Sequence, residues 1–312
     1  MTSFNDKVSN LLEYIGIHSK SYSHTLSVCT YDPEDVMPYY LDQSRRANYA
    51  GLTDQTGIPL YDLGMGPEYF PTFIGLHALG HLELYRQYNQ EENLRAAINT
   101  ANWFVDTQNG KGAWLTHTDF KRYGMLAPWP SAMAQGLAIS SLMRVYSITD
   151  QAKYLETSCR ALIPFHLPVE KGGVISYEDS YIFYDEYPSK GKWHVLNGFI
   201  FALWGLCDLY RIADNHEAEE LFADGLKTLR HYLPKFDIGY WSLYHIGKGL
   251  RNPATIPYHR LHINQMEAMY KLTGEELFGK YHNLWQKYNE KRFNALLSLP
   301  LKLAYLAVSR FS

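Results

Sequence analysis

An internal repeat with nearly even spacing limits the folds that are open to this chain. A hydrophobic residue, a tyrosine and a polar residue recur at four places: Leu84-Tyr85-Arg86, Val145-Tyr146-Ser147, Leu209-Tyr210-Arg211 and Met269-Tyr270-Lys271. Each tyrosine closes a segment rich in small and apolar residues. A long repeat of this kind is one supersecondary unit, and stacked copies bury a common core. The repeat therefore predicts four similar units.

Each unit has the pattern of a helical hairpin. In the second unit, apolar and small residues follow steps of four and three, which place them on one helical face: Ala132, Gly136, Ile139, Met143 and Tyr146. More polar partner helices are expected at roughly 91–108, 151–165, 215–233 and 275–290. We therefore predict an all-α fold, an (α/α) toroid of about four helical hairpins.

The connections between the predicted helices differ greatly in length. Turns inside a hairpin take two to four residues. The segments that enter each hairpin are long, and they span 41–70, 109–130, 168–193 and 234–259. Because the helices alternate in direction, these four segments should emerge at one end of the toroid. Loops longer than about 12–15 residues in a compact domain are usually functional, so we expect the working face at that end.

The sequence divides into three parts. Residues 1–70 are expected to form an N-terminal helix and an irregular arm packed on the main domain, and residues 71–290 form the toroid. The tail 291–312 is apolar but interrupted by Pro300. A bilayer span needs about 18–20 unbroken apolar residues, so the tail should not cross a membrane. We expect it to dock on the domain or to form a homodimer contact, with a peripheral membrane contact as the alternative.

Composition excludes several classes of function. The net charge is −3, and no zinc-finger or phosphate-loop spacing occurs, so a nucleic-acid partner is not expected. Aromatic residues make up 15% of the chain, a bias that suits sugar stacking as well as plain packing. The cysteines Cys29, Cys159 and Cys207 are odd in number and far apart, which does not suggest a disulfide framework. No signal-peptide pattern opens the sequence, so a cytoplasmic location is expected.

The four long segments differ in formal charge. Segments 41–70, 110–130, 168–193 and 234–260 carry −2, +2, −2 and +3. The cationic residues of the last segment are Lys235, Lys248, Arg251 and Arg260, against Asp237 alone. This segment is the expected place to meet an anion, although such runs also occur as plain solvated surface.

The third long segment contains Tyr181-Ile182-Phe183-Tyr184-Asp185-Glu186-Tyr187-Pro188. Pro188 disfavours a helical conformation at the preceding residue, so we expect these side chains on a bent loop without helix. Taken alone, the octapeptide fits a packed tyrosine loop with solvated acids as well as a functional site.

Several blocks resemble the C-terminal catalytic domain of the glucuronyl C5-epimerases. These blocks are Trp129-Pro130-Ser131-Ala132-Met133-Ala134-Gln135-Gly136, Tyr184-Asp185-Glu186-Tyr187-Pro188, Val195-Leu196-Asn197-Gly198-Phe199 and Tyr258-His259-Arg260-Leu261-His262-Ile263-Asn264-Gln265. Gly57-Ile58-Pro59 and Glu68-Tyr69-Phe70-Pro71-Thr72 resemble the stretch that enters this domain. The resemblance implies a helical hairpin barrel. It also implies inversion at C5 of D-glucuronate to L-iduronate within an acidic polysaccharide such as heparosan, without an organic cofactor.

The resemblance also assigns roles to residues. Glu186, Tyr187, Tyr244 and Tyr258 inherit catalytic roles. The matching blocks supply the candidate substrate-binding residues Glu68, Tyr69, Trp129, Gln135, Tyr184, Asn197, His259, His262 and Asn264.

One departure from the family concerns the cation for the substrate carboxylate. Vertebrate members carry an arginine three residues after the tyrosine that matches Tyr244, and this chain has Gly247 there. The candidates for this cation are therefore Arg251, Lys248 and Arg260, followed by Arg45, Arg46 and Arg122.

The chemistry explains why such residues are needed. The C5 proton lies next to a carboxylate and is weakly acidic, so a cation must offset the negative charge. Acid and base groups must then flank the ring on opposite faces. Glu186 suits the base if burial raises its pKa, and the phenol of Tyr258 can act from the other face.

Two other functions fit the same residue types. A polysaccharide lyase shares the proton abstraction but then expels the C4 oxygen, and a non-catalytic glycan-binding protein would use the same aromatic cleft. A metal site is not expected, because His77 and His81 lack the glutamate of a metalloprotease motif.

Overall fold

The computed structural model describes residues 32, 34–62, 66–247 and 249–308. The short helix expected at 4–15 and the candidate cation Lys248 lie outside these residues.

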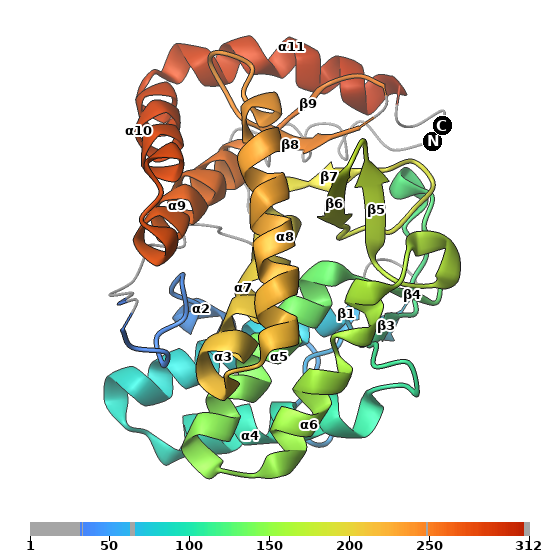
Figure 1. Cartoon of the computed structure of the whole chain (residues 1–312), viewed down its shortest axis with the longest axis vertical. Helices are drawn as coiled ribbons and strands as arrows, with labels where there is room; N and C mark the ends of the chain where they lie inside the picture. The colour runs from blue at the N-terminus through green and yellow to red at the C-terminus, as the bar shows by residue number, and fades with distance from the viewer. Residues whose placement is uncertain (1–31, 33, 63–65, 248, 309–312) are drawn as a thin grey trace.

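The four predicted helical hairpins are present (Figure 1). Their first helices are α3 (Pro71–Tyr88), α5 (Ala132–Thr149), α7 (Leu196–Ala213) and α9 (Ile256–Thr273). Their second helices are α4 (Glu91–Thr107), α6 (Ala152–Arg160), α8 (His216–Tyr232) and α10 (Glu276–Glu290). The second helix of the second hairpin ends earlier than predicted, before a 3₁₀ turn at Ile163–His166. The prediction of an all-α toroid is confirmed.

The turn after each first helix explains the tyrosine repeat. The residues that cap these helices adopt a left-handed conformation: Asn89, Asp150, Asp214 and Gly274. In three hairpins the N–H of the cap donates to the carbonyl of the repeated tyrosine: Tyr85, Tyr146 and Tyr270. Asparagine, aspartate and glycine tolerate this conformation best, so the polar breaks act as helix stops.

The first helices form the core and pack against one another in chain order. The contact between α5 and α7 is very close at two glycines. A Cβ on Gly136 would collide with the backbone at Phe201, and one on Gly205 would collide with the backbone of Gly136. Small residues on these helices therefore permit the backbone approach that the sequence predicted.

The long connections contain short strands where the sequence predicted irregular loops. These are β1 (Tyr61–Asp62), β2 (Pro67–Glu68), β3 (Leu115–Thr116), β4 (Trp129–Pro130), β5 (Ile175–Glu178), β6 (Tyr181–Tyr184), β7 (His194–Val195), β8 (Leu243–Ile246) and β9 (Asn252–Pro253). Most have two residues, too few for an alternating pattern to reveal them. They form three antiparallel pairs and the three-stranded sheet β7–β8–β9, which joins the third and fourth segments.

The strands lie away from the hairpin turns. In Figure 1, β3 to β9 occupy the right and upper parts of the molecule, while α4 and α6 lie at the bottom. The short helix α2 (Ser44–Ala47) of the arm packs on α3.

A buried ion pair fixes the arm to the core. Arg144 Nη1 on α5 lies 2.6 Å from Asp208 Oδ2 on α7, and both side chains are buried. The Tyr40 hydroxyl donates to the other oxygen of Asp208 at 2.9 Å. The guanidinium also donates to the carbonyls of Met37 and Pro38. One polar cluster therefore joins two core helices and the N-terminal arm.

The C-terminal tail forms α11 (Arg292–Val308), which runs along the top of Figure 1. Lys302 Nζ donates to Asn252 Oδ1 at 2.7 Å, and Tyr305 Oη lies 3.0 Å from His245 Nε2. The tail thus docks on β8 and β9.

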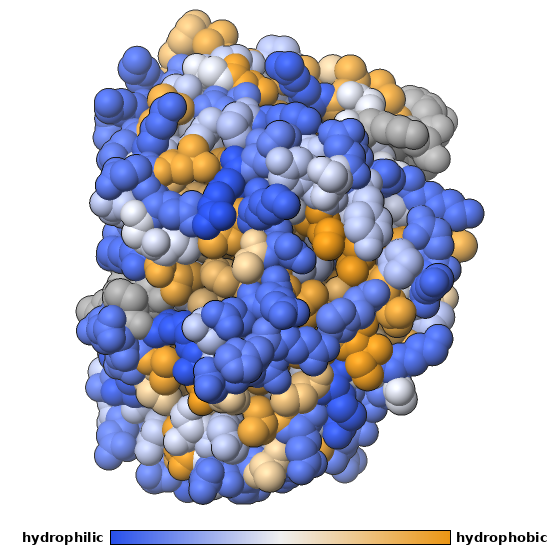
Figure 2. All heavy atoms as spheres, in the orientation of Figure 1, coloured by the Kyte–Doolittle hydropathy of each residue, from blue (hydrophilic) through white to orange (hydrophobic). Residues whose placement is uncertain are grey.

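The helix α11 departs from the predicted break and has an apolar outer face. It continues through Pro300, which is exposed, as is Leu296 one turn earlier, so water can reach the carbonyl that lacks a donor. Four of its large apolar side chains are exposed: Phe293, Leu296, Leu297 and Leu303. Orange atoms are visible along the top of Figure 2, where α11 runs. Among the described helices, none is both long and apolar enough to cross a membrane.

Candidate active site

A cavity of about 130 Å³ lies where the four long segments meet. The arm supplies Arg46 and Phe70, and the second segment supplies Thr118 and Trp129. The third supplies Glu186 and Tyr187, and the fourth supplies Tyr258, which lies in the first turn of α9. The other lining residues are Thr72, Phe73, Leu76, Thr116, Phe120, Ser131, Met133, Asn197, Phe201 and Leu261. Residues distant in sequence therefore form one hollow, at the end of the toroid where function was expected.

Glu186 is the buried acid of this cavity. It follows β6 and is only 8% exposed, and its carboxylate lies against the first turn of α7. A side chain at Gly198 would collide with its Oε2, so glycine there makes room for the acid. Burial raises the pKa of Glu186 to about 7, and the hydroxyl of neighbouring Tyr187 opposes the rise. Oε2 has no hydrogen-bond partner among the described residues. At neutral pH this group can both take and return a proton.

The preceding acid, Asp185, points elsewhere and is fully engaged. Its Oδ1 lies 2.9 Å from His194 Nδ1, and its Oδ2 accepts a hydrogen bond from Ser176 Oγ at 2.5 Å. Burial raises the pKa of Asp185, while His194 and Ser176 oppose the rise. Its backbone carbonyl also accepts from the N–H of Ala132 at the start of α5. Asp185 therefore anchors the loop, and Glu186 is left for the cavity.

The predicted catalytic tyrosines lie around Glu186. The ring of Tyr187 stacks on Tyr123 with centroids 4.3 Å apart. Tyr244 meets Tyr258 edge to face at 4.8 Å and lies behind the cavity wall. Burial, followed by the charge of Glu186, raises the pKa of Tyr187 and of Tyr244 well above the ordinary value. Both phenols therefore keep their protons at neutral pH and act as hydrogen-bond donors.

The cation at this cavity is Arg46, on α2. Of the lining residues that the structure describes, it is the only lysine, arginine or histidine. Its backbone carbonyl lies 3.0 Å from His77 Nδ1, which ties α2 to α3. Arg251 is exposed and lines a different cavity, and Arg260 Nε donates to Asn289 on α10. Two of the first-choice cations of the sequence analysis, Arg251 and Arg260, thus lie elsewhere. The third, Lys248, is outside the described residues, and the reserve candidate Arg46 lines the site.

Two of the predicted sugar-binding residues line the cavity. Asn197, at the start of α7, is buried, and its Oδ1 has no hydrogen-bond partner in the described part of the chain. Trp129 donates its indole N–H to the carbonyl of Thr118 at 3.0 Å, which fixes its ring in the wall. Buried polar atoms are normally paired in proteins, so the unpartnered oxygens of Asn197 and Glu186 are suited to sugar hydroxyls or a reacting proton.

Comparison with known families gives the relationship of the chain. The family model of the D-glucuronyl C5-epimerase C-terminus matches residues 108–287, more than half of the sequence. The chain belongs to this family. The D-glucuronyl C5-epimerase of Caenorhabditis elegans is 31% identical over 237 residues, which cover 69% of this chain and 38% of that protein.

One further relative and two solved structures are also similar to this chain. The uncharacterized protein MJ1128 of Methanocaldococcus jannaschii is 33% identical over 178 residues, 56% of this chain and 57% of that protein. The chain therefore spans less than two thirds of the length of these relatives. A cellobiose 2-epimerase from Bacillus thermoamylovorans superposes with TM-score 0.53 at 13% identity, over 70% of this chain and 59% of that one. A sugar epimerase from a ruminal bacterium gives 0.55 at 12% identity, over 90% and 83%. At these identities the likeness shows the toroid fold alone.

In this member of the family, two histidines that were predicted to bind substrate have packing roles. His259 and His262 both hydrogen-bond Ser242 Oγ through Nδ1, at 2.7 and 2.9 Å. His259 Nε2 also lies 3.2 Å from the carbonyl of Trp285. Burial lowers the pKa of His259 to about 3. Neither histidine lines the cavity, so neither would contact a ligand there. Both position the start of α9.

Other residues of the matching blocks also support the walls. The Gln135 side chain bonds the backbone of Trp114 and Gly112, and the Tyr184 hydroxyl donates to the carbonyl of Leu221. None of these residues lines the cavity.

The remaining predicted ligands lie nearby. Tyr69 donates to Asp54, and Glu68 and Asn264 lie half-buried outside the lining. The block that contains Glu68 reaches the cavity through its later residues Phe70 and Thr72.

Several lining residues were not singled out from the sequence. Phe70, Thr72 and Ser131 lie inside the matching blocks, so the resemblance contained a signal for them. Thr118 and Phe201 lie outside these blocks, and nothing local marks them. For metals, no group of three acidic, histidine or cysteine side chains in the described ranges is arranged to hold an ion.

Proposed function

We propose that this protein inverts C5 of D-glucuronate residues to L-iduronate in a heparosan-like glycan. The observation that carries the proposal is Glu186, a buried acid in a cavity that Arg46 and Tyr258 also line. Its pKa is about 7, and its Oε2 has no hydrogen-bond partner among the described residues. Strongly shifted acids in a cleft mark functional sites. The family and the fold shared with sugar epimerases support an isomerase of the epimerase class.

Glu186 acts as the base in the first step. Its carboxylate takes the C5 proton of glucuronate, and the C–H electron pair moves into the adjacent carboxylate of the sugar. The intermediate has an enediolate-like carboxylate with one additional negative charge. A base whose pKa lies near the working pH gives the largest benefit, about 10²–10⁴-fold for general acid–base catalysis.

Arg46 offsets the charge that develops on the sugar carboxylate. A preorganised donor at such a position contributes about 10²–10³-fold when its removal is measured. The guanidinium can bind both carboxylate oxygens at once. Tyr187, which lines the cavity and keeps its proton, adds a further donor, and Tyr244 packs against Tyr258 outside the lining. The free amide oxygen of Asn197 accepts a sugar hydroxyl and orients the ring.

Tyr258 completes the inversion. It stands on the first turn of α9, whereas Glu186 precedes α7, so the two groups approach the cavity from different elements. Tyr258 gives its hydroxyl proton to C5 on the face opposite to Glu186, which converts the D-gluco to the L-ido configuration. The enzyme is left with protonated Glu186 and a Tyr258 phenolate, and exchange with solvent restores both.

The charge of the cavity supports an unsulfated sugar. Among the described lining residues Arg46 is the one cation and Glu186 the one acid, which leaves one positive charge for the substrate carboxylate and none of these residues for sulfate groups. A heavily sulfated ligand would favour a strongly positive wall.

Incubation with heparosan in heavy water tests the proposal. The expected result is deuterium at C5 with iduronate in intact chains. An unsaturated chain end would identify a lyase instead, and an absence of exchange would leave a glycan-binding protein. Glu186→Gln serves as the inactive control, and Glu220→Gln, an exposed acid on α8, serves as the matched active control.

A further inference from the structure

A second, larger cavity of about 720 Å³ lies behind the sheet β7–β8–β9. Successive residues of two strands lie on opposite sides of this sheet. His194 lines the second cavity, while the next residue, Val195, packs with Trp129 beside the first. Likewise Leu243 lines the second cavity, while Tyr244 packs with Tyr258. Since neighbouring side chains of a strand point to opposite faces, one face of the sheet lines the second cavity and the other packs against the wall of the first. We name the second one the outer groove.

The outer groove has an excess of positive charge. Its lining contains the cations Lys190, Lys192, Lys235 and Arg251, against Glu178 and Asp237. Both acids already have partners. Glu178 lies 3.7 Å from Lys192, and Asp237 accepts hydrogen bonds from the N–H of Gly239 and the indole of Trp285.

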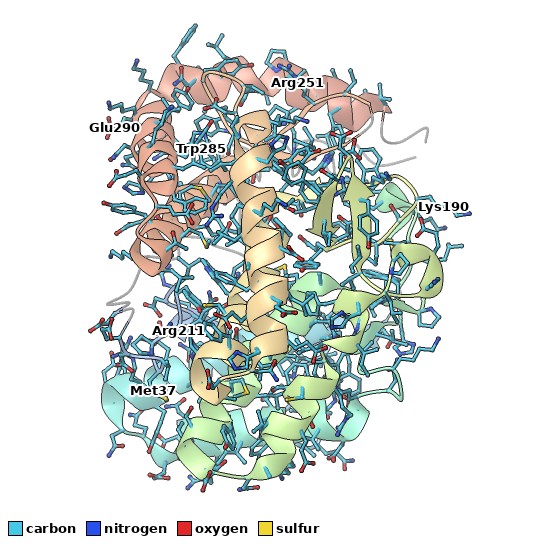
Figure 3. All side chains as sticks on the ribbon, viewed as in Figure 1. Met37, Lys190, Arg211, Arg251, Trp285 and Glu290 are labelled. Carbon is cyan, nitrogen blue, oxygen red and sulfur yellow. The ribbon has the colours of Figure 1, made fainter. Side chains whose placement is uncertain are left out.

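Two of these cations have no ion-pair or hydrogen-bond partner among the described residues. They are Lys190 and Arg251, and both are exposed. Figure 3 places Lys190 at the outer edge beside β5 and β6, and Arg251 near α11. The free charge is therefore spread along the groove rather than gathered at one point.

A buried imidazole opens into the same groove. His194 is 3% exposed, and its Nδ1 is held by Asp185 at 2.9 Å. Its Nε2 has no hydrogen-bond partner in the part of the chain that the structure describes, and Glu178 Oε2 lies 3.9 Å away, beyond hydrogen-bond distance. An unpaired buried nitrogen is rare in proteins unless a ligand pairs with it. Because Asp185 adjoins Glu186, the same loop serves both cavities.

We propose that the outer groove binds further acidic sugar units of the glycan whose one glucuronate occupies the cavity at Glu186. This inference rests on the proposed function for the class of ligand. The groove is too large for a single inorganic anion, since cavities of about 300–1,000 Å³ hold ligands of many atoms. Its separated cations fit carboxylates repeated along a chain, and the imidazole nitrogen of His194 fits a sugar hydroxyl or carboxylate oxygen.

Chain length should then decide affinity. A heparosan disaccharide supplies one glucuronate for the cavity at Glu186, whereas a long heparosan chain also reaches the outer groove. The wild-type protein should therefore show a lower KM and tighter equilibrium binding for the long chain, and added salt should weaken this preference. The double variant Lys190→Ala/Arg251→Ala removes the two unpaired charges and should reduce the preference about fivefold, in line with two exposed ion pairs.

The matched control is Lys280→Ala/Lys287→Ala, which removes two exposed lysines from α10, outside both cavities. This control should keep the full preference for the long chain. C5 deuterium exchange and calorimetric binding are measured for all three proteins with both substrates.

The outcomes separate the two proposals. If exchange is absent with both substrates, the proposed function fails, and calorimetry alone decides the groove. If exchange occurs but the long chain binds no better, or its advantage survives in the double variant, the groove proposal is overturned. An equal loss in the lysine control would also overturn it, because the effect would be nonspecific charge. A loss of kcat with both substrates would make Arg251 the carboxylate cation instead of a groove residue.

Discussion

Two buried acids, Asp208 and Glu186, have opposite surroundings. Asp208 lies between α5 and α7, and its oxygens receive the guanidinium of Arg144 and the hydroxyl of Tyr40. Glu186 lies at the open end of the toroid and has no ion-pair partner within the described residues. Burying a charge costs free energy unless it is paired. At Asp208 the protein compensates that cost to join its parts, whereas at Glu186 the cost remains as a raised pKa, which the proposed chemistry uses.

The largest effect is expected when the ion pair of Asp208 is broken. Arg144→Met leaves Asp208 buried without its cation and should lower the free energy of unfolding by about 3–5 kcal/mol. Urea denaturation measures this loss. In the double variant Arg144→Met/Asp208→Leu the unpaired charge is gone, so most of the stability should return. If the single variant loses less than about 1 kcal/mol, the ion pair does not hold the arm and the two helices together.

The next largest effect is expected when the unpaired acid, or its partner on the other face of the sugar ring, is replaced. Glu186→Gln and Tyr258→Phe should each reduce inversion by about 10²-fold or more, because each removes one proton carrier. Both substitutions keep side-chain size, so the fold should persist. Proton exchange at C5 can be measured by NMR in heavy water. Tyr258→Phe should still exchange the C5 proton of glucuronate units, and Glu186→Gln only that of iduronate units. Tyr88→Phe, at an exposed tyrosine on α3, is the control. Full inversion in either variant would remove that residue from the mechanism.

The pH dependence sharpens the contrast. An ordinary glutamate in the unfolded chain titrates near 4.5, and folding raises the pKa of Glu186 to about 7. Between these values the folded state holds the extra proton, so stability falls as pH rises. The loss of folding free energy is complete once the pH exceeds about 7, and it totals about 3 kcal/mol. Glu186→Gln should therefore be more stable than the wild type at pH 8 and equal to it near pH 4. Stability curves that stay parallel at every pH would contradict the shift.

The same pKa predicts the pH profile of activity. The free enzyme needs Glu186 ionised to take a proton, so kcat/KM for glucuronate should rise as pH passes through about 7. A profile that is already flat at pH 5 would show that Glu186 has an ordinary pKa or is not the base.

The smallest expected effect concerns the cation. Arg46→Ala should reduce kcat/KM at least about tenfold, since the sugar carboxylate then loses its counter-charge. Arg46→Lys should recover part of the rate because the charge returns without the two-point geometry. Arg260→Ala, whose side chain points to α10, is the control. Equal rates for Arg46→Ala and the wild type would place the counter-charge on another residue.

The helical framework could be predicted from the sequence because its signals are local. The tyrosine repeat and the polar stops after it follow from backbone bonds at each helix end, as at Asp150 and Gly274. The strands could not be predicted, because two residues such as His194 and Val195 carry no periodic pattern. Their pairing depends on β8, which lies beyond the whole of the third hairpin in the chain.

The site could be predicted only in part. The resemblance identified Glu186, but the residues around it were distinguished by backbone direction, which sequence does not reveal. Asp185 and Glu186 are adjacent acids, yet one binds His194 and the other enters the cavity. The charge count favoured segment 234–260, whereas the cation in the cavity is Arg46, which belongs to the N-terminal arm. Net charge of a segment does not say which side of a sheet its cations occupy.

The docking of α11 has a consequence for how the protein is made. Lys302 and Tyr305 bond the strands β9 and β8, and β8 carries Tyr244. A nascent chain leaves the ribosome from its N-terminus, so these two residues emerge after every other part of the site. The sheet thus gains these bonds only after α11 has been synthesised. A chain that stalls before Lys302 contains Glu186 but lacks the hydrogen bonds from α11 to β8 and β9.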